Sequence, residues 1–329
     1  MKEIRIAVIG AGYMGRFHAE KFAAMKDAEQ VGVEDAEQVG VAGAQLVAVV
    51  DTDRARAEQL AGALGSAAES DYRGVLPRID AACVAVPTDQ HYAIVRACLE
   101  AGVHVLVEKP LSRTLAEADE LLELARVKGM VLQVGHLQRF NPAFQALAAH
   151  SGRPLFIDIE RLAPFKARGT EVDVILDLMI HDLDLVLALA RAPVEQVSAS
   201  GFRVLTDAID IANARIEFAD GCIASLSASR VSQAAVRKLR VFRHEGYVSA
   251  DLQEQKLRSV RRRGDGIVES EQSFERADEL REQAEAFLRA VRERSMPMVS
   301  GEQGRRVLAL ALQVANLVKE RLQRHAEAP

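Results

Sequence analysis

Apolar residues form short continuous runs in the first part of the chain. The runs cover residues 4–9, 45–50, 81–86 and 103–107 and are rich in Val, Ile, Leu and Ala. Such runs are typical of strands that are buried on both faces of a parallel sheet. Helices are predicted between them, at residues 16–26, 54–64 and 91–101. The alternation predicts an α/β fold with a doubly wound sheet.

Beyond residue 150 the predicted strands mostly follow one another directly. They cover residues 155–162, 195–204, 213–218, 222–230, 237–244 and 247–252. Ala219-Asp220-Gly221 predicts a hairpin turn. Helices are expected at residues 174–190, 278–294 and 302–324.

A chain of 329 residues suits two domains. We place an N-terminal domain at residues 1–125 and a C-terminal domain at residues 126–329. A broad sheet in the second domain would have one face covered by helices. We expect its other face to be buried in a homodimer or homotetramer.

The first predicted strand ends in a glycine-rich turn. Residues 10–15 read Gly-Ala-Gly-Tyr-Met-Gly and lead directly into the first predicted helix. In a dinucleotide-binding turn, Gly10 allows the tight bend, Gly12 lets the backbone approach a pyrophosphate, and Gly15 lets helix and strand pack closely. The phosphates would lie at the helix N-terminus. The sequence therefore predicts a Rossmann domain whose cofactor contacts Gly10, Gly12, Tyr13, Met14 and Gly15.

Asp51 and Thr52 follow the second predicted strand. A carboxylate at this position can accept hydrogen bonds from the adenosine ribose and would repel a 2′-phosphate, so NAD is expected rather than NADP. Arg54 and Arg56 lie close by and could favour a phosphate. Their alternative role is in the solvated first turn of the next helix.

Further cofactor candidates follow the third predicted strand. Pro87, Thr88 and His91 belong to the sheet edge where a dinucleotide binds. We expect them beside the ribose or the nicotinamide. For His91 the alternative is a helix N-terminal residue whose ring is satisfied by the backbone.

The fourth predicted strand ends in Glu108-Lys109-Pro110. Pro110 restricts the backbone, and the strand end places the Lys109 cation where cofactor and substrate should meet. Its charge could stabilise a developing alkoxide. We expect both Glu108 and Lys109 to contact the cofactor. The alternative is a surface lysine that happens to follow a strand.

Residues 174–190 combine an apolar helical face with three polar groups. Asp177, His181 and Asp184 have the spacing i, i+4 and i+7, which predicts one stripe on a helix. Asp177 can accept a hydrogen bond from His181 and set its tautomer, which leaves the other ring nitrogen for a substrate hydroxyl. A metal site has thin support here, and a purely structural histidine is the alternative.

Composition excludes several other classes of protein. The net charge of −5 gives no general attraction to nucleic acid or anionic membranes. Cys83, Cys98 and Cys222 are widely spaced, which suggests neither a disulfide framework nor a zinc site. No apolar run is long enough for a membrane span or a signal peptide, so we expect a cytoplasmic protein.

Two local features are interpreted as parts of the protein surface. Residues 27–33 recur as residues 35–41, a tandem copy that we interpret as a surface excursion remote from the cofactor. The basic cluster Arg261-Arg262-Arg263 stands at a glycine-containing turn and is followed by acidic sequence. We therefore expect a solvated hairpin end instead of a nucleic-acid site.

Several motifs together resemble the glucose-fructose oxidoreductase/inositol dehydrogenase/MocA (Gfo/Idh/MocA) family of NAD(P)-dependent oxidoreductases. They are the glycine turn with His18, residues 87–91, residues 107–110, residues 135–142 and residues 177–184. The resemblance covers essentially the whole chain. It implies a Rossmann domain followed by an α/β domain with a large open, mostly antiparallel sheet.

The resemblance also implies roles for individual residues. Lys109 corresponds to the family's usual catalytic lysine, and Asp177 and His181 to its Asp-x-x-x-His pair. His181, oriented by Asp177, would remove the proton of a secondary alcohol while Lys109 stabilises the oxyanion. The roles of Lys109 and His181 could be exchanged. No metal is implied.

Residues 135–142, 161–169 and 174–182 are most similar to the branch of the family that oxidises the 3-hydroxyl of UDP-N-acetylglucosamine, in lipid A or surface-polysaccharide synthesis. Arg139, Lys166 and Arg168 would then suit the diphosphate, with an interdomain salt bridge as the alternative for Arg139. A dehydrogenase of myo-inositol or a free sugar is the alternative substrate class. A non-catalytic dinucleotide sensor is the alternative function.

Overall fold

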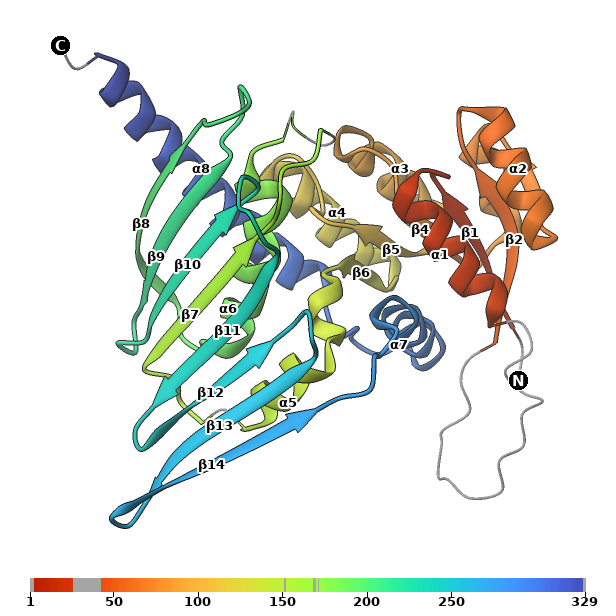
Figure 1. Cartoon of the computed structure of the whole chain (residues 1–329). Coiled ribbons are helices and arrows are strands. Elements are labelled where there is room, and N and C mark those ends of the chain that lie inside the picture. The colour runs from red at the N-terminus through yellow and green to blue at the C-terminus, as the bar shows by residue number, and fades with distance from the viewer. Residues whose placement is uncertain (1–2, 26–42, 151, 168–169, 171, 328–329) are drawn as a thin grey trace, which may run out of the picture. The chain divides into compact units, whose positions relative to one another are not determined.

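The computed structural model describes residues 3–25, 43–150, 152–167, 170 and 172–327 (Figure 1). The tandem repeat at residues 27–41 and Arg168 lie outside the described residues. The chain divides into two compact units. Unit 1 comprises residues 1–137 and 278–305, and unit 2 comprises residues 138–277 and 306–329.

The predicted domain boundary at 125/126 differs from this division. It falls inside helix α4 (Leu115–Lys128), and the next strand, β6 (Leu132–Gly135), still pairs with β5 (His104–Glu108) of the first sheet. Unit 1 also includes a segment from near the C-terminus, residues 278–305. A cut at one position therefore cannot describe the two units.

Unit 1 contains a six-stranded parallel sheet. Besides β5 and β6 it comprises β1 (Ile4–Ile9), β2 (Ala44–Val50), β3 (Ala67–Glu69) and β4 (Ala81–Val84). The strand order is β3-β2-β1-β4-β5-β6, which is the Rossmann order with its switch point between β1 and β4. β1 and β4 are almost completely buried, as their apolar runs predict. The predicted Rossmann domain is confirmed.

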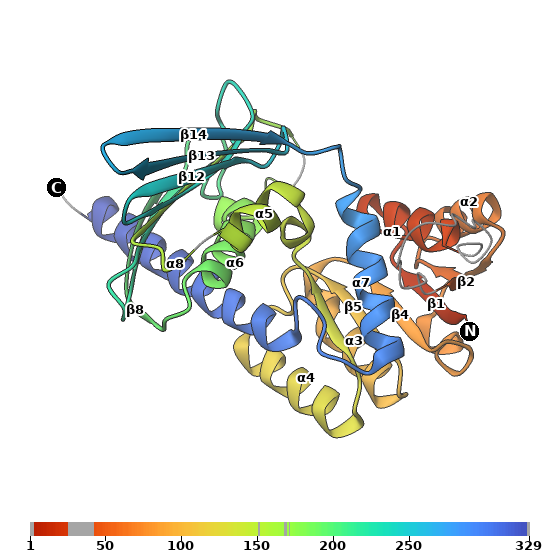
Figure 2. The ribbon, with the colours of Figure 1, turned by 90° about the horizontal axis from the view of Figure 1, so that it is seen from below.

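Helices cover both faces of this sheet (Figure 2). They are α1 (Tyr13–Ala24), α2 (Arg54–Leu64), α3 (Thr88–Glu100), α4 and α7 (Glu279–Glu293). α1 packs against α7, and α3 packs against α4. Phe22 and Phe287 are fully buried in one cluster with β1, which explains why residues 278–305 belong to this unit. Short 3₁₀ turns lie at Tyr72–Gly74, Leu76–Arg78 and Leu137–Phe140.

Unit 2 is built on an eight-stranded sheet. Its strands are β7 (Phe156–Leu162), β8 (Val194–Phe202), β9 (Ile211–Phe218), β10 (Ile223–Ser229), β11 (Val236–Arg243), β12 (Gly246–Asp251), β13 (Lys256–Arg263) and β14 (Gly266–Ser273). The order is β14-β13-β12-β11-β7-β10-β9-β8 (Figure 1), and only the β7–β10 pair among these described strands is parallel. The expected large, mostly antiparallel sheet is confirmed. The basic cluster at residues 261–263 lies at the end of the β13–β14 hairpin, as predicted.

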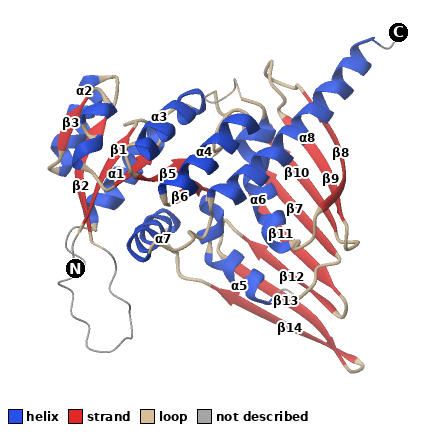
Figure 3. Ribbon diagram, turned by 180° about the vertical axis from the view of Figure 1, so that it is seen from behind, coloured by secondary structure: helices blue, strands red, loops and turns tan. Residues whose placement is uncertain are grey.

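One face of the second sheet is packed with helices (Figure 3). α5 (Pro142–His150), α6 (Ile180–Leu189) and the part of α8 (Gly301–Glu327) in unit 2 share one buried cluster with the strands. A π-helical turn, Ile175–Met179, directly precedes α6. The regular helix predicted from residue 174 is therefore wrong in its first part. Among the described helices, none combines the length and apolar content that a membrane span requires.

Candidate active site

The glycine turn follows β1 at the switch point of the unit 1 sheet. Gly10 has φ +99°, and a Cβ there would lie 2.4 Å from the carbonyl oxygen of Ala85. A Cβ on Gly15 would lie 1.8 Å from the carbonyl oxygen of Gly10. At Gly12, by contrast, a Cβ would meet no atom within 4 Å. Two glycines are thus required by the fold, whereas the third keeps open space of the kind a pyrophosphate needs.

The neighbouring residues support a dinucleotide site. Asp51 Oδ2 accepts a hydrogen bond of 2.8 Å from the backbone N–H of Ala11, so the carboxylate lies against the glycine turn. Arg56 lies 3.6 Å from Asp51 and 3.2 Å from Asp53, and Arg54 pairs with Glu58. Both arginines therefore have carboxylate partners in or next to the first turn of α2. This agrees with the solvated-turn interpretation and leaves the preference for NAD in place.

Other predicted cofactor residues surround the same sheet edge. Tyr13 opens α1 with 59% of its surface exposed, and Met14 follows it half-buried. Thr52 is exposed after β2. Pro87 directly precedes α3, and Thr88 is its first residue. In parallel strands these carboxyl ends share one edge, so unit 1 gathers the predicted cofactor residues there.

His91 lies near the N-terminus of α3, and its ring is satisfied by the backbone, as in the second of the two interpretations of this residue. The ring is 1% exposed, with Nδ1 2.8 Å from the carbonyl oxygen of Pro110 and Nε2 2.9 Å from that of Val86. Burial lowers the pKa of His91, against the backbone contacts and charges that raise it. The ring therefore connects the turns after β4 and β5 instead of projecting from the edge toward a cofactor.

Glu108 ends β5 at the same edge and Lys109 follows it directly, with a cis peptide bond between Lys109 and Pro110. Glu108 Oε1 lies 2.8 Å from Nε2 of His18, a fully buried side chain of α1. His18 belongs to the family motifs, but no role for it follows from its place in the sequence. Because its partner is 90 residues away, local spacing offers no signal for this pair.

In unit 2, Asp177 and His181 lie on either side of the junction between the π-helical turn and α6. Both are half-buried. The backbone N–H of Asp177 donates to the carbonyl oxygen of Asp173 at 3.0 Å. π-Helical turns within α-helices occur frequently at functional sites, because they change the direction of side chains. The predicted hydrogen bond between Asp177 and His181 stays a prediction.

Asp184 is buried, whereas Asp177 and His181 are half-buried. It is 1% exposed, and its Oδ1 lies 3.6 Å from Nη1 of Arg139. Burial raises the pKa of Asp184 to about 7, although the charge of Arg139 opposes the shift. The pair lies within unit 2, so the interdomain salt bridge considered for Arg139 is not the contact observed. The single stripe of three polar groups stays a prediction.

A cavity of about 920 Å³ lies beside the π-helical turn in unit 2. Its described lining includes Phe165, Leu176, Leu205, Asp207 and Lys319. Leu176 directly precedes Asp177. Lys166, predicted to bind a diphosphate, is exposed between the lining residues Phe165 and Ala167.

The wall of this cavity at residues 204–206 is fixed by one buried carboxylate. Asp210 Oδ2 accepts backbone N–H bonds of 2.7–2.9 Å from Val204, Leu205 and Thr206. Burial alone would raise the pKa of Asp210, but these bonds and the Thr206 hydroxyl lower it to about 2. The ionised Asp210 thus binds the backbone of residues 204–206, of which Leu205 and Thr206 line the cavity.

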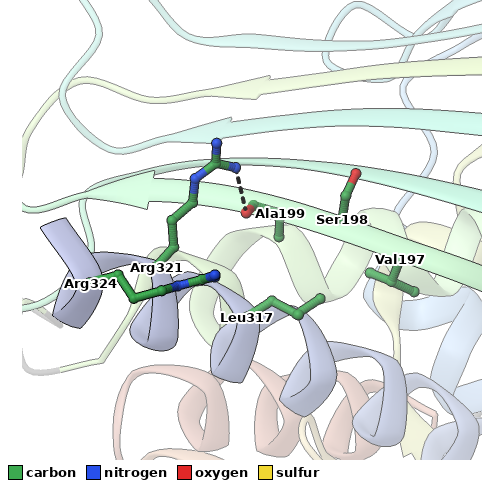
Figure 4. A pocket seen from close by; sticks show the side chains of 6 residues that line it. All are labelled: Val197, Ser198, Ala199, Leu317, Arg321 and Arg324. Atoms are coloured by element: carbon green, nitrogen blue, oxygen red, sulfur yellow. Dashed lines mark hydrogen bonds between the residues drawn. The ribbon is translucent and has the colours of Figure 1, made fainter.

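A second concavity of unit 2, of about 440 Å³, lies between β8 and α8 (Figure 4). Arg321 and Arg324 reach it from α8, and Arg321 donates to the carbonyl oxygen of Ala199 at 3.5 Å. The larger cavity is lined by the sequence neighbours of Lys166 and Asp177, whereas neither a predicted site residue nor a sequence neighbour of one lines this concavity. We therefore do not place the active site in this concavity.

Comparison with known proteins identifies the family. The model described as "Oxidoreductase family, NAD-binding Rossmann fold" matches residues 4–136, and the Gfo/Idh/MocA C-terminal domain model matches residues 148–249. The chain belongs to the Gfo/Idh/MocA oxidoreductase family. Unit 1 thus contains the NAD-binding Rossmann domain of an oxidoreductase.

Individual family members are similar over nearly the full chain. UDP-N-acetylglucosamine 3-dehydrogenase of Acidithiobacillus ferrooxidans is 38% identical, with 98% of this chain and 100% of that protein covered. A solved structure of that enzyme has a TM-score of 0.88 at 37% identity, covering 97% and 99% of the two chains. Myo-inositol 2-dehydrogenase of Thermotoga maritima is 28% identical, with 97% of each chain covered.

Proposed function

We propose that this protein is an NAD-dependent dehydrogenase of a secondary alcohol on a sugar, with the 3-hydroxyl of UDP-N-acetylglucosamine as its substrate. The observation that carries the proposal is 38% identity over 98% of the chain to an enzyme of that name. The product would be a 3-keto nucleotide sugar. The reversible chemistry needs a hydride acceptor, a base for the hydroxyl proton and a group that stabilises the oxyanion.

The residues of the chain fit these requirements. NAD, when bound, accepts the hydride from the alcohol carbon. His181 would remove the hydroxyl proton, Asp177 would orient His181, and Lys109 would stabilise the oxyanion. A sensor that only binds a dinucleotide would need no such set, which favours the enzyme.

The cavity lined by Leu176, the residue before Asp177, supports a substrate larger than a monosaccharide. Its volume of about 920 Å³ is near the upper end of the range of about 300–1,000 Å³ that small-molecule sites occupy. Phe165 offers an aromatic face, Asp207 offers acceptors for hydroxyl groups, and Lys166 supplies a nearby cation. These are the groups that a base, a ribose and a phosphate require.

The test follows NADH absorbance with UDP-N-acetylglucosamine, and in parallel with myo-inositol, glucose and NADP. We expect reduction of NAD with the nucleotide sugar. A silent nucleotide-sugar reaction beside an active myo-inositol reaction would transfer the proposal to the inositol branch, which the 28% identical relative represents. Tight NAD binding without turnover of any substrate would favour the sensor.

Lys109→Ala tests the assignment inside the enzyme. We expect turnover to fall by about 10²–10³-fold, because an oxyanion-stabilising group is lost, while NAD still binds. Lys128→Ala is the matched control, because Lys128 is exposed in the last turn of α4 of the same unit. Unchanged turnover in Lys109→Ala would remove Lys109 from the mechanism.

A further inference from the structure

Two buried histidines of unit 1 contact the two residues that flank Lys109 in the sequence. His18 of α1 reaches Glu108 at 2.8 Å, and His91 of α3 reaches the carbonyl oxygen of Pro110 at 2.8 Å. The two residues that flank Lys109 in sequence are therefore each fixed by a helix packed on the sheet. Neither histidine is available to solvent, with exposures of 0% and 1%.

The carboxylate of Glu108 contacts both His18 and the backbone of Lys109. Its second oxygen, Oε2, accepts a hydrogen bond of 3.3 Å from the backbone N–H of Lys109. Space for this carboxylate is provided by Gly135 of β6, where a Cβ would lie 3.2 Å from both Oε2 and Cδ. One carboxylate thus links the helix that begins at the glycine turn to the backbone of Lys109.

The charges of the pair favour this arrangement. Burial lowers the pKa of His18, but Cys83 and Glu108 outweigh it and raise the pKa to about 10. For Glu108, burial raises the pKa, while His18 and Lys109 lower it below the usual range. Cys83 of β4, His91 of α3 and Lys109 are the other titratable groups that act on the pair. Both shifts favour the charged forms of the pair, an imidazolium and a carboxylate.

We propose that His18 is a positioning residue for Lys109: it holds one oxygen of the Glu108 carboxylate, and the other oxygen of that carboxylate fixes the backbone N–H of Lys109. The consequence for catalysis rests on the role that the proposed function gives to Lys109. The link itself, from His18 through Glu108 to the N–H of Lys109, is a property of unit 1 and is testable without turnover.

His18→Gln tests the charge while a donor to Glu108 remains. Without the cation, burial raises the pKa of Glu108, so a protonated Glu108 forms as the pH falls and its bond to Lys109 weakens. We expect kcat of the variant to fall about tenfold per pH unit below that pKa, with KM for the sugar little changed. The double variant His18→Gln/Glu108→Gln lacks the titrating carboxyl and should lose this acid limb.

His104→Gln is the matched control for loss of a buried histidine. His104 is 7% exposed, begins β5 at the end opposite Lys109, and accepts a hydrogen bond of 2.9 Å from the N–H of Val131. The control should lower stability without adding an acid limb. A His18→Gln enzyme with the native pH profile, or a control with the same new limb, would overturn the proposal.

A second measurement does not depend on the reaction. In protein labelled with ¹⁵N-lysine, the Lys109 amide resonance reports the protonation of Glu108, and Lys109→Ala assigns it. We expect this resonance to stay constant from weakly acidic to neutral pH in the native protein and to titrate in His18→Gln. Titration in the native protein, or none in the variant, would overturn the link, whereas absence of turnover alone would count only against the proposed function.

Discussion

At the scale of single residues, the three glycines of the coenzyme turn have different physical tasks. A Cβ on Gly15 would meet the backbone of Gly10 at 1.8 Å, which only a backbone shift can relieve. A Cβ on Gly12 would enter open space. The same substitution by alanine should therefore affect folding at one position and only the ligand at the other.

We expect Gly12→Ala to keep the melting temperature of the free protein and to weaken NAD binding at least about tenfold, since the methyl group blocks close approach of the pyrophosphate. Gly15→Ala should lose both stability and NAD binding. Gly62→Ala, within α2, is the control: its Cβ also meets nothing within 4 Å, and alanine should stabilise the helix by about 0.5–1 kcal/mol. Thermal unfolding and calorimetric titration with NAD measure all three. Equal NAD affinity in Gly12→Ala and native protein would contradict the assigned approach.

At the scale of secondary structure, β7 and α6 are joined by a buried ion pair. Nε and Nη2 of Arg161 donate to the carboxylate of Asp182 at 2.7–2.9 Å, and both side chains are at most 6% exposed. Burial raises the pKa of Asp182 although Arg161 and Arg237 lower it. The pair fixes the first turn of α6, which also carries His181.

Removal of one partner should leave a buried charge without compensation. We expect Arg161→Met to cost about 3–5 kcal/mol of unfolding free energy, and Arg161→Met/Asp182→Leu to recover most of it. Arg54→Met, which breaks the exposed pair with Glu58, should have a far smaller effect. Urea unfolding of the three variants gives the comparison. A double variant as unstable as the single one would show that the pair contributes more than charge compensation.

The sequence predicts most of these elements, because hydrophobic periodicity is a local property. β1 agrees with its predicted bounds, and β2, β7 and β10 agree within one residue of theirs at each end. The π-helical turn at Ile175–Met179 escapes prediction, since one inserted residue changes side-chain direction without changing composition. β13 and β14 are not predicted as strands, because their mostly exposed charged residues lack an apolar alternation.

At the scale of the whole molecule, the contacts that local patterns cannot reveal are those between distant segments. Residues 278–305 return to unit 1, where Lys21 lies 2.6 Å from Asp278 and Phe287 joins the α1 core. The candidate residues Lys109, Asp177 and His181 follow from sequence because motifs mark them. The sequence does not reveal that His18 pairs with Glu108 or that Arg139 pairs with Asp184, because the fold brings these distant residues together.

The buried Asp184, which pairs with Arg139, should make the stability of the whole protein depend on pH. Its pKa is raised to about 7 in the native state from an ordinary value of 3.8, chiefly by burial. Between these two pH values the native state retains a proton that the unfolded chain has released. The contribution of Asp184 to the unfolding free energy therefore falls as the pH rises through this window, and changes no further above it.

Asp184→Asn removes this titration while it keeps the size of the side chain. We expect the native protein to gain stability relative to the variant when the pH is lowered from about 8 to about 5. The difference in unfolding free energy between the two proteins should change by an amount of the order of a few kcal/mol. Urea unfolding at both pH values measures the difference. Parallel pH dependence in the two proteins would mean that Arg139, 3.6 Å away, keeps Asp184 ionised throughout, and the raised pKa would then be wrong. The expected divergence would instead show that this ion pair forms fully only above neutral pH. In the weakly acidic range Asp184 would be protonated, so Arg139 would lack the negative charge of this partner.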